Sequence, residues 1–263
     1  MEKLILVKLG GSIITNKSKE YFAREENITR FAREIKLALN EANIKIIVGH
    51  GAGSFAHTPA SVYKTKEGLI AKNSLFGMGV TEEAARRLNG IVVKKFVGEK
   101  LPVYTFSPGS FIISDAKVYS KSYIDPIIKA LEIGIVPIVH GDVVLDIKMG
   151  FTIFSTEKIL SILANRMKKN YEIKMIYVTD VDGVHDERGK VIPVITNKNF
   201  DQLKSSIDGA KGVDVTGGML HKVEEALFLA KKTGIKTQII NGKRPGLLKN
   251  VILGKKVGGT IIS

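Results

Sequence analysis

Short apolar segments that end in glycine-rich turns constrain this chain more than any other feature. Buried-strand patterns at residues 4–7, 44–48, 135–139 and 173–179 alternate with helical patterns at 28–42, 81–97, 123–132, 159–168 and 219–233. Apolar strands that alternate with helices are typical of parallel sheets covered on both faces. The sequence therefore predicts an α/β fold, a three-layer αβα sandwich around a mainly parallel, open twisted sheet.

Weaker patterns complete this outline. Residues 102–106 and 237–240 read as short strands, and residues 257–262 as a strand at the edge of the sheet. Thr81 is expected to cap the helix that follows it. Because the 263 residues contain no internal repeat and no Pro- or Ser-rich linker, we expect one domain over 1–263.

Composition narrows the classes of partner. The net charge is +14, but no run of five or six lysines occurs and aromatic residues make up only 7%. A solvated basic surface on a protein that handles anionic substrates is therefore favoured over nucleic-acid or membrane binding. The absence of cysteine excludes disulfides, thiolate metal sites and cysteine catalysis, and is compatible with a cytoplasmic protein.

The first strand leads into Lys8-Leu9-Gly10-Gly11-Ser12. In an open parallel sheet, ligands bind in loops beyond the carboxyl ends of the strands. Two glycines let the backbone approach an anion closely, and Lys8 and Ser12 add a charge and a hydroxyl. The plainer alternative is a tight turn with a solvated lysine.

The second strand leads into a turn in which small residues alternate with His50 and His57, over residues 49–57. The glycine spacing does not match a dinucleotide fingerprint, and no Gly-Lys-Ser/Thr follows as in a Walker loop. The turn remains suited to bind an anion, with Ala52 and Gly53 in its backbone. His57 at its end is a candidate donor to a phosphate rather than an ordinary surface histidine.

Three further turns share this chemistry. Gly141 follows the third strand. Asp180, Asp182 and Gly183 follow the fourth, where the aspartates suit a nucleotide hydroxyl or amine, or else a simple turn. Gly217 begins a helix that carries Lys222, so that an anion would meet free N–H groups, the helix dipole and an amine. Glycine turns combined with lysines suit phosphoryl transfer, which depends on positioning and charge neutralisation.

These motifs resemble the amino acid kinase superfamily over nearly the whole chain. Within it, His57, the lysine in Ser12-Ile-Ile-Thr-Asn-Lys17 and His140-Gly-Asp are similar to the isopentenyl phosphate kinases. The resemblance implies ATP-dependent transfer of a phosphoryl group to isopentenyl phosphate or a similar prenyl monophosphate. It also implies Mg²⁺, a homodimer, an acceptor lobe over about residues 1–150 and a nucleotide lobe over about residues 151–263.

The resemblance also implies a role for each matching residue. The catalytic residues would be Lys8, Lys17, His57 and Lys222. ATP would be bound by Lys8, Gly10, Gly11, Ser12, Gly53, Asp180, Gly183, Gly217 and Lys222, and the acceptor by Ala52, His57 and Gly141. A five-carbon tail would lie against residues 76–93, with Met78 and Val80 as candidates. No carboxylate pair stands out as a metal ligand, so Mg²⁺ would be held mostly by phosphates and water.

Some positions depart from the family pattern. Ala52 and Ala56 replace frequent glycines and would narrow the second turn slightly. Ser155-Thr-Glu-Lys158 stands where the family has a pattern closer to Ser-Gly-Asp-Asp, and Glu157 would replace an aspartate that orients the lysines. Two alternatives stay open: a kinase for another phosphate or phosphonate, such as the fosfomycin-type kinases, and a basic nucleic-acid-binding protein without catalysis.

Overall fold

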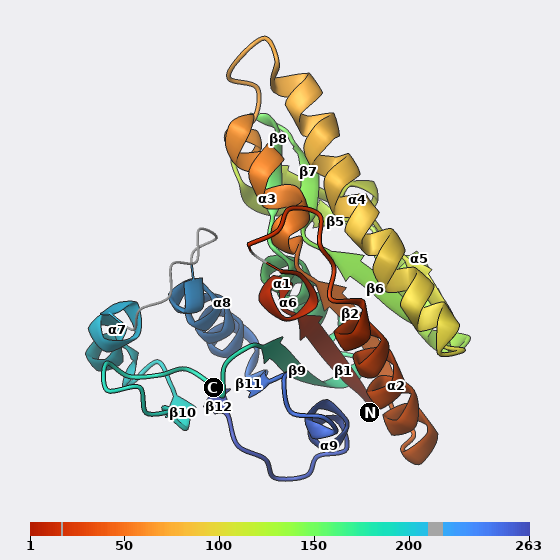
Figure 1. Ribbon diagram of the computed structural model, residues 1–263, viewed down its shortest axis with the longest axis vertical. Helices are drawn as coiled ribbons and strands as arrows, with labels where there is room; N and C mark the ends of the chain where they lie inside the picture. The colour runs from red at the N-terminus through yellow and green to blue at the C-terminus, as the bar shows by residue number, and fades with distance from the viewer. Residues whose placement is uncertain (17, 210–217) are drawn as a thin grey trace.

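A computed structural model describes residues 1–16, 18–209 and 218–263 of the chain. Its centre is a large sheet with helices on both faces, and a smaller sheet lies towards one end of the molecule beside α3 (Gly53–Val62) and α4 (Ser74–Gly98) (Figure 1). The α/β sandwich predicted from the sequence is thereby confirmed.

The large sheet is mainly parallel. Its strand order is β10 (Val194–Ile195), β12 (Thr260–Ile262), β11 (Thr237–Asn241), β9 (Tyr171–Thr179), β1 (Glu2–Leu9), β2 (Lys45–His50), β6 (Val136–His140) and β3 (Val103–Thr105). Among the described strands of this sheet, only β11 and β12 pair in antiparallel orientation. The prediction of an edge strand at 257–262 is wrong, because β12 is covered by the two-residue strand β10.

Helices cover the large sheet with two separate apolar cores. One core is formed with α1 (Gly11–Ile14), α2 (Glu25–Glu41), α4 and α9 (Leu247–Ile252), and the other with α5 (Asp125–Glu132), α6 (Thr156–Met167), α7 (Phe200–Gly209) and α8 (Gly218–Thr233). No helix in the described part of the chain is long and apolar enough to cross a bilayer.

Side chains of β1 alternate between these two cores, as the pleat requires. Leu4 and Leu6 pack into the core on the side of α6, whereas Ile5, Val7 and Leu9 pack on the side of α2. Lys8 therefore points towards α6 at the carboxyl end of the sheet.

The helix predicted from residue 81 begins earlier. Thr81 lies inside α4, and its buried hydroxyl donates to the carbonyl of Gly77 at 2.8 Å. The prediction that Thr81 caps the helix is therefore wrong: its hydroxyl bonds to the carbonyl of the preceding turn, a contact that threonine can make when it lies within a helix.

The smaller sheet was not recognised in the sequence because its strands are short. Its order is β5 (Val118–Ser122), β4 (Ile112–Asp115), β7 (Asp142–Asp146) and β8 (Gly150–Phe154). The side chain of Asp146 links the turn between β4 and β5 to the turn between β7 and β8. Its buried carboxylate accepts hydrogen bonds from the Ser114 hydroxyl and from backbone amides at 116, 117, 148 and 149.

Replacing Asp146 with asparagine should change how stability depends on pH. Burial alone would raise the pKa of Asp146, but the amide and hydroxyl donors lower it well below its ordinary value of 3.8. The carboxylate therefore stabilises the fold at neutral pH, and this contribution is lost as the pH falls through and below that ordinary value. We expect Asp146→Asn to lower the melting temperature at neutral pH and to flatten its decline in acid. Parallel curves for wild type and variant would contradict this, and Asp201→Asn, an exposed carboxylate in α7, is the control.

Candidate active site

The first two glycine turns touch each other. β1 and β2 are paired in parallel, so the turns after them lie side by side at the same edge of the sheet. A Cβ atom on Gly11 would stand 2.8 Å from the Cα atom of Gly53, and one on Gly10 would stand 2.8 Å from the Val178 carbonyl oxygen. Gly53 also has a φ of +52°, with Thr15 against the place of its missing side chain. These positions require glycine, and they bring the main chains of the two turns into close contact, in what we call the glycine cradle.

The second turn continues directly into α3. Ala52 precedes the first helical residue, Gly53, and His57 lies one turn further on, exposed to solvent. Ala56 was expected to narrow the turn. Its buried methyl belongs instead to a small cluster with Ala84 and Ala85 of α4. This places the methyl group in the packing between α3 and α4.

Lys8 is buried and forms an ion pair with the buried Glu157 in the first turn of α6. The Lys8 Nζ atom stands 5.9 Å from the ring centroid of Tyr177, on the neighbouring strand β9. Burial alone would raise the pKa of Glu157, but the charges of Lys8 and then Lys222 lower it below its ordinary value. Glu157 is therefore a carboxylate between two lysines, and the alternative of a solvated Lys8 does not hold.

Several residues predicted to bind ATP lie around the first turn and beyond the end of β9. The Ser12 hydroxyl donates to Asp180 at 2.8 Å, which joins the first turn to the end of β9. Lys222 in α8 donates to the Gly218 carbonyl at 3.0 Å. Asp182 accepts a hydrogen bond from Asn241 at 3.0 Å and pairs with Arg244 at 2.7 Å. These two contacts favour the structural role that the sequence left open for Asp182.

Gly183 and Gly141 both lie where backbone and side chains crowd together. A Cβ atom on Gly183 would stand 2.7 Å from the Thr260 hydroxyl, and one on Gly141 would stand 3.0 Å from the Thr156 hydroxyl. Thr156 is the first residue of α6 and donates to the His50 carbonyl at 2.7 Å. Gly141 thus lies beside the helix that supplies Glu157.

Two buried histidines lie beneath these turns. His50 and His140 occupy opposite positions on β2 and β6, and their rings stack with centroids 5.4 Å apart. Burial and then the charge of His140 lower the pKa of His50 to about 4. The Nε2 atom of His50 lies 3.1 Å from Asn89, and that of His140 lies 3.1 Å from Asp142. His50 is thus a neutral core residue at physiological pH and differs from the exposed His57.

Two of the predicted site residues, Lys17 and Gly217, lie outside the described residues, and their roles stay predictions. The structure brings the others together along one edge of the large sheet: Lys8, Gly10, Gly11, Ser12, Ala52, Gly53, Gly141 and Asp180, with His57 on α3, Lys222 on α8 and Gly183 beyond β9. Their individual roles also stay predictions.

Sequence reasoning missed one neighbour of Lys8. The family resemblance had offered Glu157 as the residue that orients the lysines, and the structure pairs it with Lys8, but Tyr177 was not named. The strand alternation already indicates which helix faces Lys8. Lys8 lies on the same face of β1 as Leu4 and Leu6, so it must face the helix that packs on that side. Tyr177 follows from the β1–β9 register, which pairs it with Lys8. That register is a property of the fold and cannot be read from either segment alone.

Two surface grooves can be placed in the fold, one between α4 and β7 and one between α2 and α4. One, of about 230 Å³, is lined by Met78, Glu82, Ser107, Gly109, Ser110, Asp142, Val143 and Leu145. Met78, one of the two residues predicted to contact an acceptor tail, lines it and Val80 does not, and the tail site stays a prediction.

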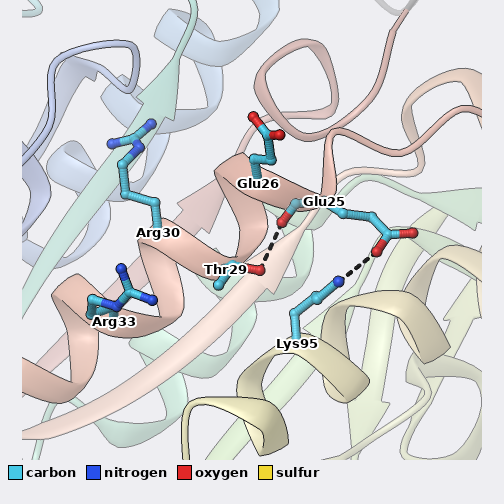
Figure 2. Close-up of a pocket in the computed structure, with 6 residues that line it drawn as sticks. All are labelled: Glu25, Glu26, Thr29, Arg30, Arg33 and Lys95. Atoms are coloured by element: carbon cyan, nitrogen blue, oxygen red, sulfur yellow. Dashed lines mark hydrogen bonds and ion pairs between the residues drawn. The ribbon is translucent and has the colours of Figure 1, made fainter.

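The other groove, of about 560 Å³, is charged and is shown in Figure 2. Glu25 and Lys95 pair across it at 2.5 Å, and Arg30 and Arg33 pair with Glu34 and Glu99. Because these cations already have carboxylate partners, we do not place an anionic substrate there.

Comparisons with known proteins agree on one family. The model of the amino acid kinase family matches residues 3–241. The chain is 35% identical to the isopentenyl phosphate kinase of Methanothermobacter thermautotrophicus, over 99% of both chains, and 33% identical to that of Methanocaldococcus jannaschii, over 98% of both. A solved structure described as isopentenyl phosphate kinase superposes with a TM-score of 0.83 at 32% identity, over 99% of this chain and 100% of the other.

Proposed function

The chain belongs to the amino acid kinase family, and we propose that it transfers the γ-phosphoryl group of ATP to isopentenyl phosphate to form isopentenyl diphosphate. The observation that carries the reaction type is the glycine cradle with the buried Lys8–Glu157 pair at its floor. The acceptor follows from the full-length similarity to two isopentenyl phosphate kinases.

The lysines supply the electrostatic part of the reaction. We assign Lys8 and Lys222 to neutralise charge on the transferring phosphoryl group, which carries charge on its equatorial oxygens in the transition state. Glu157 holds Lys8 in place through their buried ion pair. Gly10, Gly11 and Ser12 would bind the ATP phosphates through backbone N–H groups and a hydroxyl.

The acceptor side needs a binding group and no base. A phosphate monoester is largely dianionic near neutral pH, since its second pKa is about 6. Its oxygen can therefore attack without losing a proton. We assign His57 to donate a hydrogen bond to that phosphate, above the N-terminus of α3, where free backbone N–H groups favour an anion.

The residues present fit Mg²⁺ as an ATP-bound ion. Magnesium prefers oxygen ligands and usually keeps several waters alongside phosphate oxygens. Ser12 and Asp180 have side-chain oxygens 2.8 Å apart at the first turn. These are the protein oxygens that would bind the ion or its waters. When bound, the ion would neutralise charge on the ATP phosphates.

Other parts of the assignment remain predictions. These are the acceptor lobe over about 1–150 and the nucleotide lobe over about 151–263, the absence of a nucleic-acid partner, and a cytoplasmic location. For the homodimer, the supporting feature is β3, an edge strand of the large sheet whose Tyr104 is 59% exposed. An exposed edge of this kind can be covered by a second copy.

The proposal is tested by coupling ADP release to an optical signal, with isopentenyl phosphate, UMP and an amino acid as acceptors. We expect turnover with isopentenyl phosphate and background rates with the other two. Turnover only with UMP or the amino acid would disprove the acceptor assignment and leave the kinase assignment intact. No ADP release with any acceptor would disprove both.

A further inference from the structure

Lys158 is an unusual residue for its place in the fold. It follows Glu157 in the first turn of α6, where the helix dipole favours acidic side chains over basic ones. It is also partly buried, which disfavours an ammonium group further. A lysine in this position must therefore make contacts that offset both costs.

Those contacts tie α6 to the smaller sheet. The Lys158 Nζ atom donates to the Lys117 carbonyl at 2.6 Å and stands 3.8 Å from the ring centroid of Phe154, the buried last residue of β8. At its other end, the Lys158 amide donates to the Ser155 side chain that caps α6. The residue is thus held through both its main chain and its side chain.

The carbonyl that Lys158 reaches is itself fixed. It belongs to the turn between β4 and β5, where Ala116 and Lys117 both have positive φ angles of 49° and 66°. Asp146 accepts hydrogen bonds from the amides of both residues, at 3.0 and 2.8 Å. Because the same carboxylate also accepts from the turn between β7 and β8, Lys158 contacts a turn that is hydrogen-bonded to both hairpins of the smaller sheet.

We propose that Lys158 is a positioning residue that fixes the first turn of α6 against the smaller sheet and thereby holds the Glu157 carboxylate on Lys8. The inference rests on the proposed function, since it assigns Lys158 an effect on phosphoryl transfer. Nothing in it requires Lys158 to touch either substrate. It acts on rate through Glu157, and misplacement of a supporting group by about 1 Å can cost on the order of a hundredfold in rate.

The test is a double-mutant cycle between positions 158 and 157. We expect Lys158→Met to lower kcat by on the order of tenfold or more, with the KM for ATP near the wild-type value. Lys158→Arg, which can still donate to the carbonyl, should restore most of the rate. In a Glu157→Gln background, Lys158→Met should have no further effect on kcat, because the carboxylate through which it acts is gone.

Lys174→Met is the matched control. Lys174 is also a partly buried lysine that donates to a backbone carbonyl, that of Val251 at 3.1 Å, but on β9 and away from α6. It should lower the melting temperature without changing kcat. If Lys158→Met is too unstable to purify, Lys158→Gln takes its place in the cycle.

An equal loss of kcat in the wild-type and Glu157→Gln backgrounds would overturn the proposal, as would an unchanged kcat in Lys158→Met. The wild-type rate with isopentenyl phosphate is measured first. Turnover of another acceptor alone would overturn the proposed function, and the cycle would then be read with that acceptor. A wild type without turnover of any acceptor would overturn both.

Discussion

Lys8→Met is expected to lower kcat by on the order of a thousandfold, the effect of removing one preorganised charge that stabilises a transition state. Lys8 is buried, paired with Glu157 and placed at the floor of the glycine cradle. Methionine matches the length of its stem, so that the charge is the main thing lost. Steady-state kinetics with ATP and isopentenyl phosphate give the measurement, and the KM for ATP should change much less than kcat.

The same variant should also destabilise the fold, because it leaves the Glu157 carboxylate buried beside one lysine fewer. Combining Lys8→Met with Glu157→Gln removes the unpaired charge and should recover melting temperature without recovering kcat. This separates the catalytic loss from the stability loss. Lys45→Met is the control, since Lys45 lies on the adjacent strand at the opposite end of the sheet. A Lys8→Met enzyme within tenfold of the wild-type rate would contradict the assigned role.

His57→Ala is expected to lower kcat/KM for isopentenyl phosphate by about a hundredfold, the order of loss for one hydrogen bond to a charged group that is stronger in the transition state. The loss should appear in the acceptor parameters and leave the KM for ATP unchanged. His57 is exposed on α3, so we expect little change in melting temperature.

Thr58→Ala provides the control for that experiment. Thr58 is the next residue of α3, also exposed, and its hydroxyl donates to Glu20 at 2.9 Å. It should keep the wild-type kcat/KM. If His57→Ala did so too, or if it raised the KM for ATP as much as that for the acceptor, His57 would not be the group that binds the acceptor phosphate.

The large sheet could be predicted because its strands are continuous apolar runs that end in glycines. The smaller sheet could not, because strands such as β4 and β5 have only four and five residues and mix polar with apolar ones without a regular alternation. The position of β12 was also beyond sequence reasoning. Its neighbour β10 consists of two residues, and no pattern marks so short a strand.

The site shows the same division. Gly10, Gly11 and Gly53 could be chosen from their spacing alone, because each lies just after a predicted strand. The partners of Lys8 could not, because Glu157 lies 149 residues away and meets it only through the packing of α6 on the sheet. The contact between Lys158 and Lys117 is even harder to predict, because it depends on a hairpin turn of the smaller sheet, which could not be recognised in the sequence.

The contact between Gly11 and Gly53 has a consequence for evolution of this site. On the proposed assignment both glycines bind ATP, but the turn of Gly53 also carries the acceptor residues Ala52 and His57, and the two turns meet through main-chain atoms. The distance between the two bound substrates is then fixed by main-chain atoms. Side-chain mutations elsewhere in these loops can change which acceptor binds without changing that distance, so a new acceptor specificity needs no change in the turn after β1.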